Sequence, residues 1–205
     1  QGRTPGKYIF EVKDFVIGYE EPLSSPLNFA IERGSKIAFT GANGIGKTTL
    51  IKSLLGIVPP LSGKCETGEN ILPGYFEQEG DYQNKTTCIE EIWQEFPSFN
   101  QYEVRSALAK CGLTTKHIES QVRVLSGGEQ AKVRLCKIIN RETNVLLLDE
   151  PTNHLDVNAR KIVGDYLNSK KGFILVSHDR NFLDSCVDHI LSINRNNICL
   201  LYTSD

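Results

Sequence analysis

SKIAFTGANGIGKTTL (35–50) is the stretch that decides the fold of this chain. Its first part, SKIAFTG (35–41), is a short apolar run typical of a β-strand. From Lys47 to Leu55 the apolar residues recur at helical spacing. The glycine-rich segment between them fits G-x-x-x-x-G-K-[ST], in which backbone N–H groups at a helix N-terminus surround a phosphate. The stretch therefore predicts a strand, a phosphate-binding loop and a helix.

Two further features supply the chemistry that a phosphate loop needs. Lys47 is expected to reach the β and γ phosphates, and the Thr48 hydroxyl is expected to ligate Mg²⁺. NVLLLDE (144–150) is an apolar run, typical of a buried parallel strand, that ends in two carboxylates. Beside a phosphate loop, Asp149 can hold Mg²⁺ through a water, and Glu150 can orient or deprotonate an attacking water. Taken alone, the strand could equally end in acidic turn residues.

LSGGEQ (125–130) resembles the phosphate loop in placing glycines at the start of another predicted helix. Ser126 offers a hydroxyl, and Gly127 and Gly128 expose backbone N–H groups at the N-terminus of a predicted helix over 127–140. By itself, S-G-G is an ordinary entry to a helix. Its functional interpretation depends on the other motifs.

Strand-like and helical segments alternate at both ends of the chain, whereas the middle is helical. This order predicts an α/β sheet with a helical arm inserted between about 80 and 140. The predicted strands are 8–17, 27–34, 35–41, 71–79, 144–149, 173–177 and a final β pair at 189–193 and 197–202, with a turn at 59–64. The predicted helices are 47–55, 88–96, 101–112, 127–140 and 157–168, with one more after 177.

Composition excludes several classes of protein. Of the 205 residues, 40% are hydrophobic and 23% charged, which excludes a disordered chain. The net charge of −2 neither demands a polyanionic partner nor excludes one that docks on a local patch. No apolar run approaches the roughly 20 residues that span a bilayer. Six cysteines without a C-x-x-C pair, and the polar opening QGRTPGK (1–7), predict free thiols in a cytoplasmic protein. The absence of methionine, even at position 1, predicts a piece of a longer protein.

Five motifs occur in a fixed order over about residues 10–195: GANGIGKTT, GYFEQE, LSGGEQ, LLLDEPTNHLD and VSHD. Together they resemble the ATP-binding cassette (ABC) ATPase domain. The resemblance implies a P-loop NTPase fold with a mixed sheet, an antiparallel β subdomain and the helical arm, with ATP as substrate and Mg²⁺ as cofactor. It also implies a sandwich dimer in which each ATP lies between the phosphate loop of one cassette and the LSGGEQ of the other.

The resemblance assigns roles residue by residue. The ATP-binding set is Tyr19, as the aromatic that stacks on adenine, with Gly41, Asn43, Gly44, Gly46, Lys47, Thr48 and Thr49. Catalytic roles fall on Glu150, on Gln78, which senses Mg²⁺ and the attacking water, and on His178, which contacts the γ-phosphate; Thr48, Gln78 and Asp149 are the Mg²⁺ set. Ser126, Gly127, Gly128, Glu129 and Gln130 are expected to serve the ATP of a partner cassette, and Asp156 to communicate across the dimer. His117 and His189 are interpreted as surface or packing residues.

Two features resemble the F subfamily, whose members act on ribosomes. EPTNHLD (150–156) is followed by SHDRNFLD (177–184). Gln78 lies only 31 positions after Lys47, which leaves room for little more than one hairpin. Transporter domains carry a longer insertion there. The resemblance implies ribosomal RNA and tRNA as partners and a second cassette on the same polypeptide, of which this chain fits the C-terminal one better. The alternatives are the ATP-binding subunit of a membrane transporter and a catalytically idle fragment.

The expected boundaries are a core at about 8–79 and 141–197 and an arm at about 80–140. The tail 198–205, with CLLYTSD at its end, resembles vector read-through and carries no functional expectation. Eight Lys and Arg against four Glu at 101–143 support a ribosomal partner only weakly. The ribosomal assignment therefore rests on the resemblance.

Overall fold

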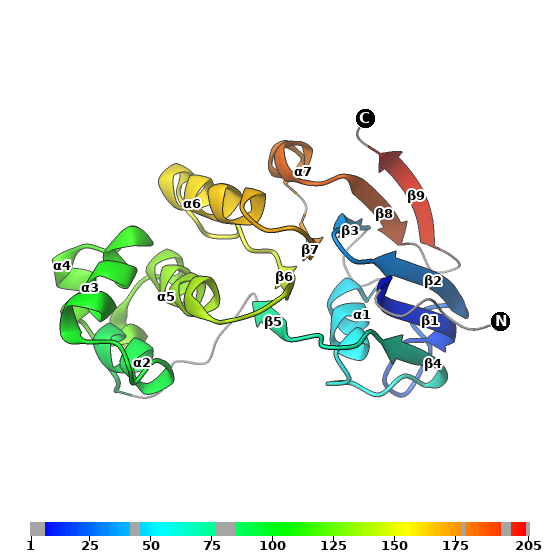
Figure 1. Cartoon of the computed structure of the whole chain (residues 1–205), viewed down its shortest axis with the longest axis horizontal. Coiled ribbons are helices and arrows are strands. Elements are labelled where there is room, and N and C mark those ends of the chain that lie inside the picture. The colour runs from blue at the N-terminus through cyan, green and yellow to red at the C-terminus, as the bar shows by residue number, and fades with distance from the viewer. Residues whose placement is uncertain (1–6, 42–45, 77–84, 178, 194–197, 204–205) are drawn as a thin grey trace.

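A computed structural model describes residues 7–41, 46–76, 85–177, 179–193 and 198–203. The described chain contains two sheets, with helices packed on both faces of the larger one (Figure 1). The strands are β1 (Tyr8–Val16), β2 (Leu27–Glu32), β3 (Lys36–Thr40), β4 (Ser62–Thr67), β5 (Pro73–Phe76), β6 (Val145–Asp149), β7 (Phe173–Val176), β8 (His189–Ile193) and β9 (Ile198–Thr203). The helices are α1 (Lys47–Leu54), α2 (Cys88–Glu95), α3 (Gln101–Lys110), α4 (Thr115–Glu119), α5 (Gly127–Asn140), α6 (Val157–Asn168) and α7 (Arg180–Cys186), with a 3₁₀ turn at Val122–Val124.

The larger sheet has the order β5-β6-β7-β3-β8-β9 and is parallel except for β9, which pairs antiparallel with β8. Every residue of β6 and β7 is buried, as the continuous apolar runs predicted. The final β pair is also confirmed. β3 and β7 are neighbours, but α1, which follows β3, packs on one face of the sheet and α7, which follows β7, packs on the other. The chain therefore switches faces between these two strands, and such a switch point is where α/β sheets bind ligands.

Alternate residues of the buried strands serve two separate cores. Leu147 of β6 points into a cluster with α1, β1 and β2, so the small antiparallel sheet β2-β1-β4 covers this face. Leu146 and Leu148 point into a second cluster with α2, α3, α5 and α6. The period of two along a strand produces this division, and it places α1 and α5 on opposite faces of the sheet.

Two ion pairs join α2 to α5 and to the residue that follows it. Lys137 of α5 lies 2.7 Å from the buried Glu91 of α2, and Arg141 pairs with Glu95 one turn further along. The first pair is only partly exposed, so its loss would leave a carboxylate in a largely dry site. Within the region predicted as a helical arm, the described residues 85–140 contain α2, α3, α4 and α5, and α5 packs on α2, α3 and the sheet (Figure 1).

Two local predictions are wrong. The sequence predicted a turn at 59–64 and about one hairpin between Lys47 and Gln78. Instead, β4 pairs with β1 in the small sheet, whereas β5 joins β6 in the large one, so the described part of this segment contains no hairpin. β4 is an exposed, polar edge strand whose sequence lacks alternating apolar residues, and its pairing is set by β1. The short helix α4 was also missed, because five residues carry too little periodicity.

Candidate nucleotide site

The phosphate loop connects β3 to α1, as predicted. Gly46 is the N-cap of α1 and has a left-handed backbone (φ 96°), which favours glycine. A Cβ at Gly46 would lie 3.2 Å from a side-chain carbon of Leu23 and 3.3 Å from one of Ile17. The segment that carries Tyr19 therefore packs against the end of this loop. Tyr19 itself is 60% exposed, so its ring is available to a ligand.

Lys47, the first residue of α1, is buried and its ammonium donates to the carbonyl of Gly41 at 2.7 Å. Burial lowers the pKa of Lys47, while the negative charges of Glu150 and Asp149 act to raise it. Both carboxylates predicted for this site are therefore close enough to act on the lysine. A cation held at a helix N-terminus, with little water around it, suits a phosphate ligand.

The structure also joins the two oxygen donors that were predicted to hold Mg²⁺. The Thr48 hydroxyl lies 2.6 Å from Asp149 Oδ2, although 101 residues separate them in sequence. Asp149 is the last residue of β6 and is 3% exposed. A hydroxyl and a carboxylate in contact form a hard oxygen donor set, which fits Mg²⁺.

Glu150 follows directly and is held by the neighbouring strand. Its backbone N–H donates to the carbonyl of Val176 at 2.7 Å, and its own backbone is left-handed (φ 48°). A non-glycine residue in this conformation is strained, and such strain is concentrated at functional sites. Thr49, also predicted to bind ATP, is buried in α1. Asn43, Gly44, Gln78 and His178 lie outside the described residues.

The signature residues form a separate site at the start of α5. Ser126 is exposed and caps the helix, with its hydroxyl accepting from the Glu129 N–H at 3.3 Å. Gly127 is exposed as well, and Gln130 donates to the carbonyl of Val122 at 3.0 Å. Because α5 and α1 pack on opposite faces of the sheet, these residues do not belong to the Lys47 site within one chain.

Three contacts around the signature were not predicted. His117 of the arm lies 3.5 Å from the Glu129 carboxylate, although the sequence suggested only a surface or packing role for this histidine. Lys132 donates to Asp156 at 2.9 Å. Gly128 passes so close to the backbone of His154 that a Cβ would lie 2.8 Å from its carbonyl oxygen. No local sequence pattern predicts these contacts, because each joins segments that are distant in sequence.

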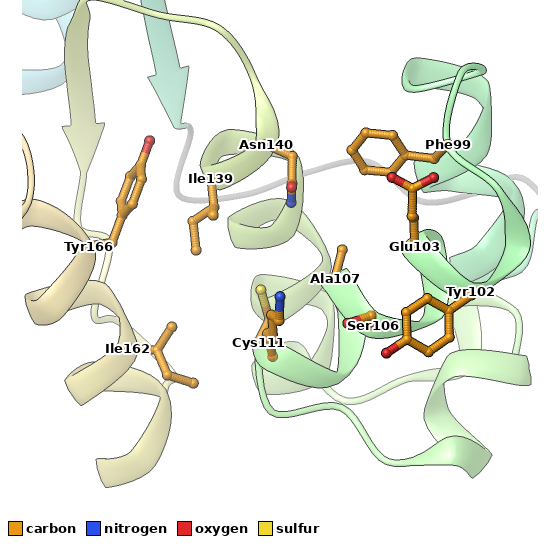
Figure 2. A pocket seen from close by; sticks show the side chains of 11 residues that line it. Phe99, Tyr102, Glu103, Ser106, Ala107, Cys111, Ile139, Asn140, Ile162 and Tyr166 are labelled. Atoms are coloured by element: carbon orange, nitrogen blue, oxygen red, sulfur yellow. The ribbon is translucent and has the colours of Figure 1, made fainter.

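A cavity of about 510 Å³ lies away from this chemistry, between α3, α5 and α6 (Figure 2). Tyr166 and Ile162 line one side, Phe99 and Tyr102 the other, and Asn140 lies between them. None of the predicted site residues lines it. In the described parts of the chain, no group of three or more His, Cys, Asp or Glu could hold a metal ion, and no helix has the length and apolarity to span a membrane.

Residues 24–153 match the protein family described as "ABC transporter". The chain is 66% identical, over 181 residues, to the uncharacterised ABC transporter ATP-binding protein YfmM of Bacillus subtilis, covering 88% of this chain and 35% of that protein. It is 36% identical to ABC transporter F family member 2 of Arabidopsis thaliana, covering 92% and 28%, and to the energy-dependent translational throttle protein EttA of Haemophilus influenzae, covering 93% and 35%. The chain thus spans about a third of the length of these relatives.

Solved structures show the same fold. A bacterial Atm1-family ABC exporter with ATP bound superposes with a TM-score of 0.82 at 19% identity, covering 96% of this chain and 39% of that one. A dimeric ATP-binding cassette in a post-hydrolysis state, bound to ADP and Pi, superposes with a TM-score of 0.75 at 18% identity, covering 92% and 96%. The fold class predicted from the motifs is therefore confirmed.

Proposed function

Because the chain belongs to the ABC transporter family, we propose that it is an ATPase cassette that hydrolyses Mg-ATP at a composite site shared with a second cassette. The observation that carries this proposal is the convergence of Lys47, Thr48, Asp149 and Glu150 at the junction of β3, α1 and β6. The second cassette is either a further domain of the parent protein or another copy of this chain.

Each residue of this cluster has a distinct role in the proposal. Lys47 neutralises charge on the β and γ phosphates, aided by the N–H groups at the start of α1. Thr48 and Asp149 would hold Mg²⁺, which would neutralise phosphate charge when bound. Glu150 accepts the proton of the attacking water. Its backbone N–H bond to Val176 fixes the backbone of Glu150 relative to the sheet.

The remaining roles complete the composite site. Tyr19 stacks on adenine from the segment that packs on Gly46, and Gln78 and His178 act on the water and the γ-phosphate. The exposed signature residues at the start of α5 contact the ATP of the partner cassette. Asp156 communicates between the two sites. Binding of ATP closes the dimer because the closed state alone offers both sets of contacts.

We further propose that the parent protein is an F-subfamily factor that acts on the ribosome in the cytoplasm. The support is the pair EPTNHLD (150–156) and SHDRNFLD (177–184), together with relatives that include an F family member and a protein named as a translational throttle. In this proposal the chain comprises a core at about 8–79 and 141–197 and an arm at about 80–140. Ribosomal RNA and tRNA are then the partners of the parent protein.

Replacement of Glu150 by Gln tests the ATPase proposal. We expect Glu150→Gln to bind ATP with unchanged affinity, to accumulate as an ATP-bound dimer and to lose turnover by at least about 100-fold, the contribution of a general base. Glu142→Gln is the matched control, because Glu142 is exposed on the connection from α5 to β6. Unchanged turnover in Glu150→Gln would remove this residue from its role.

The parent protein carrying Glu150→Gln tests the ribosomal proposal. With ATP, it is expected to co-sediment with ribosomes, and this association should be lost when ADP replaces ATP. Co-purification with an integral membrane protein, without ribosome binding, would identify the ATP-binding subunit of a transporter instead.

A further inference from the structure

Lys132 links α5, the helix that begins with the signature residues, to residues 150–156, which follow β6. It lies on α5 and is only 9% exposed. Its ammonium donates to Asp156 Oδ2 at 2.9 Å, while Asp156 Oδ1 accepts from the N–H of Ala159 at 2.8 Å and caps α6. Both oxygens of Asp156 are thus used within the chain. The carboxylate is held in one orientation by two elements, the start of α6 and the middle of α5.

A second contact joins the same two segments one turn earlier on α5. An ideal Cβ at Gly128 would lie 2.8 Å from the carbonyl oxygen of His154, so the two backbones are in direct contact there. Residues 128 and 132 are four apart on a helix and lie on the same face. The signature end of α5 therefore packs on residues 154–156 through a backbone contact and an ion pair.

The Lys132 side chain packs against the end of α3. A Cβ at Gly112, just after α3, would lie 3.6 Å from both Cε and Nζ of Lys132. The lysine chain thus runs between the end of an arm helix and Asp156. The Lys132 side chain is 11% exposed, against 35% for Arg105 in its pair with Glu119, whereas the two carboxylates are about equally exposed. The Lys132 ammonium is therefore less screened by water than the Arg105 guanidinium, and its hydrogen bond to a carboxylate is charge-assisted.

We propose that Lys132 is a positioning residue that couples the two ATP sites of the cassette dimer. This inference rests on the proposed composite site. The segment from Glu150 to Asp156 belongs to the chain's own ATP site at one end, and it contacts the signature helix that serves the partner's ATP at the other. Lys132 holds α5 and this segment together. When α5 closes on the partner's ATP, the contact therefore positions Glu150 at the chain's own ATP.

The test uses Lys132→Met, Lys132→Arg and the control Lys161→Met, which removes an exposed charge on α6. The first readout is binding of a fluorescent ATP analogue to dilute, monomeric protein. The second is turnover as a function of ATP concentration. We expect Lys132→Met to leave analogue affinity within about twofold. Turnover should slow about tenfold, because loss of this charged hydrogen bond misplaces Glu150 in the closed dimer. The ATP dependence of turnover should become less cooperative.

The two partners of the ion pair separate positioning from a general loss of structure. Asp156→Asn keeps an oxygen for the α6 cap but loses the charge that Lys132 contacts, and the side chain of Asp156 is 58% exposed, so this variant should fold even where Lys132→Met does not. The double variant should turn over no more slowly than the slower single one. Lys132→Arg should restore most of the rate because it keeps the charge.

Three results would overturn the inference. Lys132→Met could turn over as fast as Lys161→Met, or the effects of Lys132→Met and Asp156→Asn could multiply in full. Alternatively, the Glu150→Gln chain with unaltered Lys132 could fail to dimerise with ATP, which would refute the proposed composite site itself and this inference with it.

Discussion

The contact between Gly128 and His154 makes a sharp prediction about stability. Alanine at position 128 would place a Cβ 2.8 Å from a backbone carbonyl oxygen, about 0.6 Å closer than ordinary van der Waals contact. Side-chain rotation cannot relieve this contact, because His154 O is a backbone atom and the Cβ position is fixed by the helical backbone of residue 128. The strain must move α5 away from residues 154–156.

Gly127 is the matched control because a Cβ there meets nothing within 4 Å. Both residues lie in the first turn of α5, so the gain of about 0.5–1 kcal/mol from replacing a helical glycine by alanine is common to both variants. The difference between them isolates the overpacking cost, which is typically about 1–3 kcal/mol. Gly128→Ala should therefore be less stable than Gly127→Ala by about that amount.

The assay is equilibrium unfolding of the nucleotide-free chain in urea, followed by far-UV circular dichroism. Without nucleotide, the result does not depend on the role of either glycine in ATP binding. If the two variants differed by less than about 0.5 kcal/mol, the close packing of α5 on residues 154–156 would be refuted.

Further predictions concern three charged groups. Lys47→Ala should abolish measurable ATP binding in titration calorimetry while leaving the circular dichroism spectrum unchanged, and retained affinity would contradict the phosphate-loop assignment. Lys137→Met should lower the free energy of unfolding by about 1–3 kcal/mol because it leaves the buried Glu91 without its cation, whereas Arg105→Met, in an exposed pair, should change it by less than about 0.5 kcal/mol. The N–H of the Ala159 backbone, and then Lys132, lower the pKa of Asp156 below its usual 3.8, so wild type should be more stable than Asp156→Asn above that pH. This advantage should shrink as the pH falls below 3.8, and an advantage that is constant down to pH 3 would contradict the assignment.

The cluster of Lys47, Thr48 and Asp149 was predictable because these residues lie at defined ends of secondary structure. A buried parallel strand and a glycine-rich turn place Asp149 and Thr48 at the same edge of a sheet, and the structure brings them to 2.6 Å. The ion pair of Lys132 and Asp156 was not predictable, since nothing in the periodicity of α5 indicates which segment its polar residues meet. β4 was missed for a related reason, because its strand conformation comes from pairing with β1 rather than from its own residues.

The account depends most on the claim that one chain's phosphate loop and another chain's signature share each ATP. Mixing two inactive variants tests it directly: Lys47→Ala, which keeps the signature, and Ser126→Glu, which places a carboxylate where the partner's γ-phosphate is expected. With random pairing, half of the dimers in an equal mixture are mixed, and each mixed dimer has one intact site. The account therefore predicts that the mixture regains turnover, although neither variant alone is active. A quarter of wild-type turnover is the upper limit, because coupling between the sites lowers the rate of a dimer with one intact site. A mixture as inactive as its two components, or a Ser126→Glu chain as active as wild type, would contradict it.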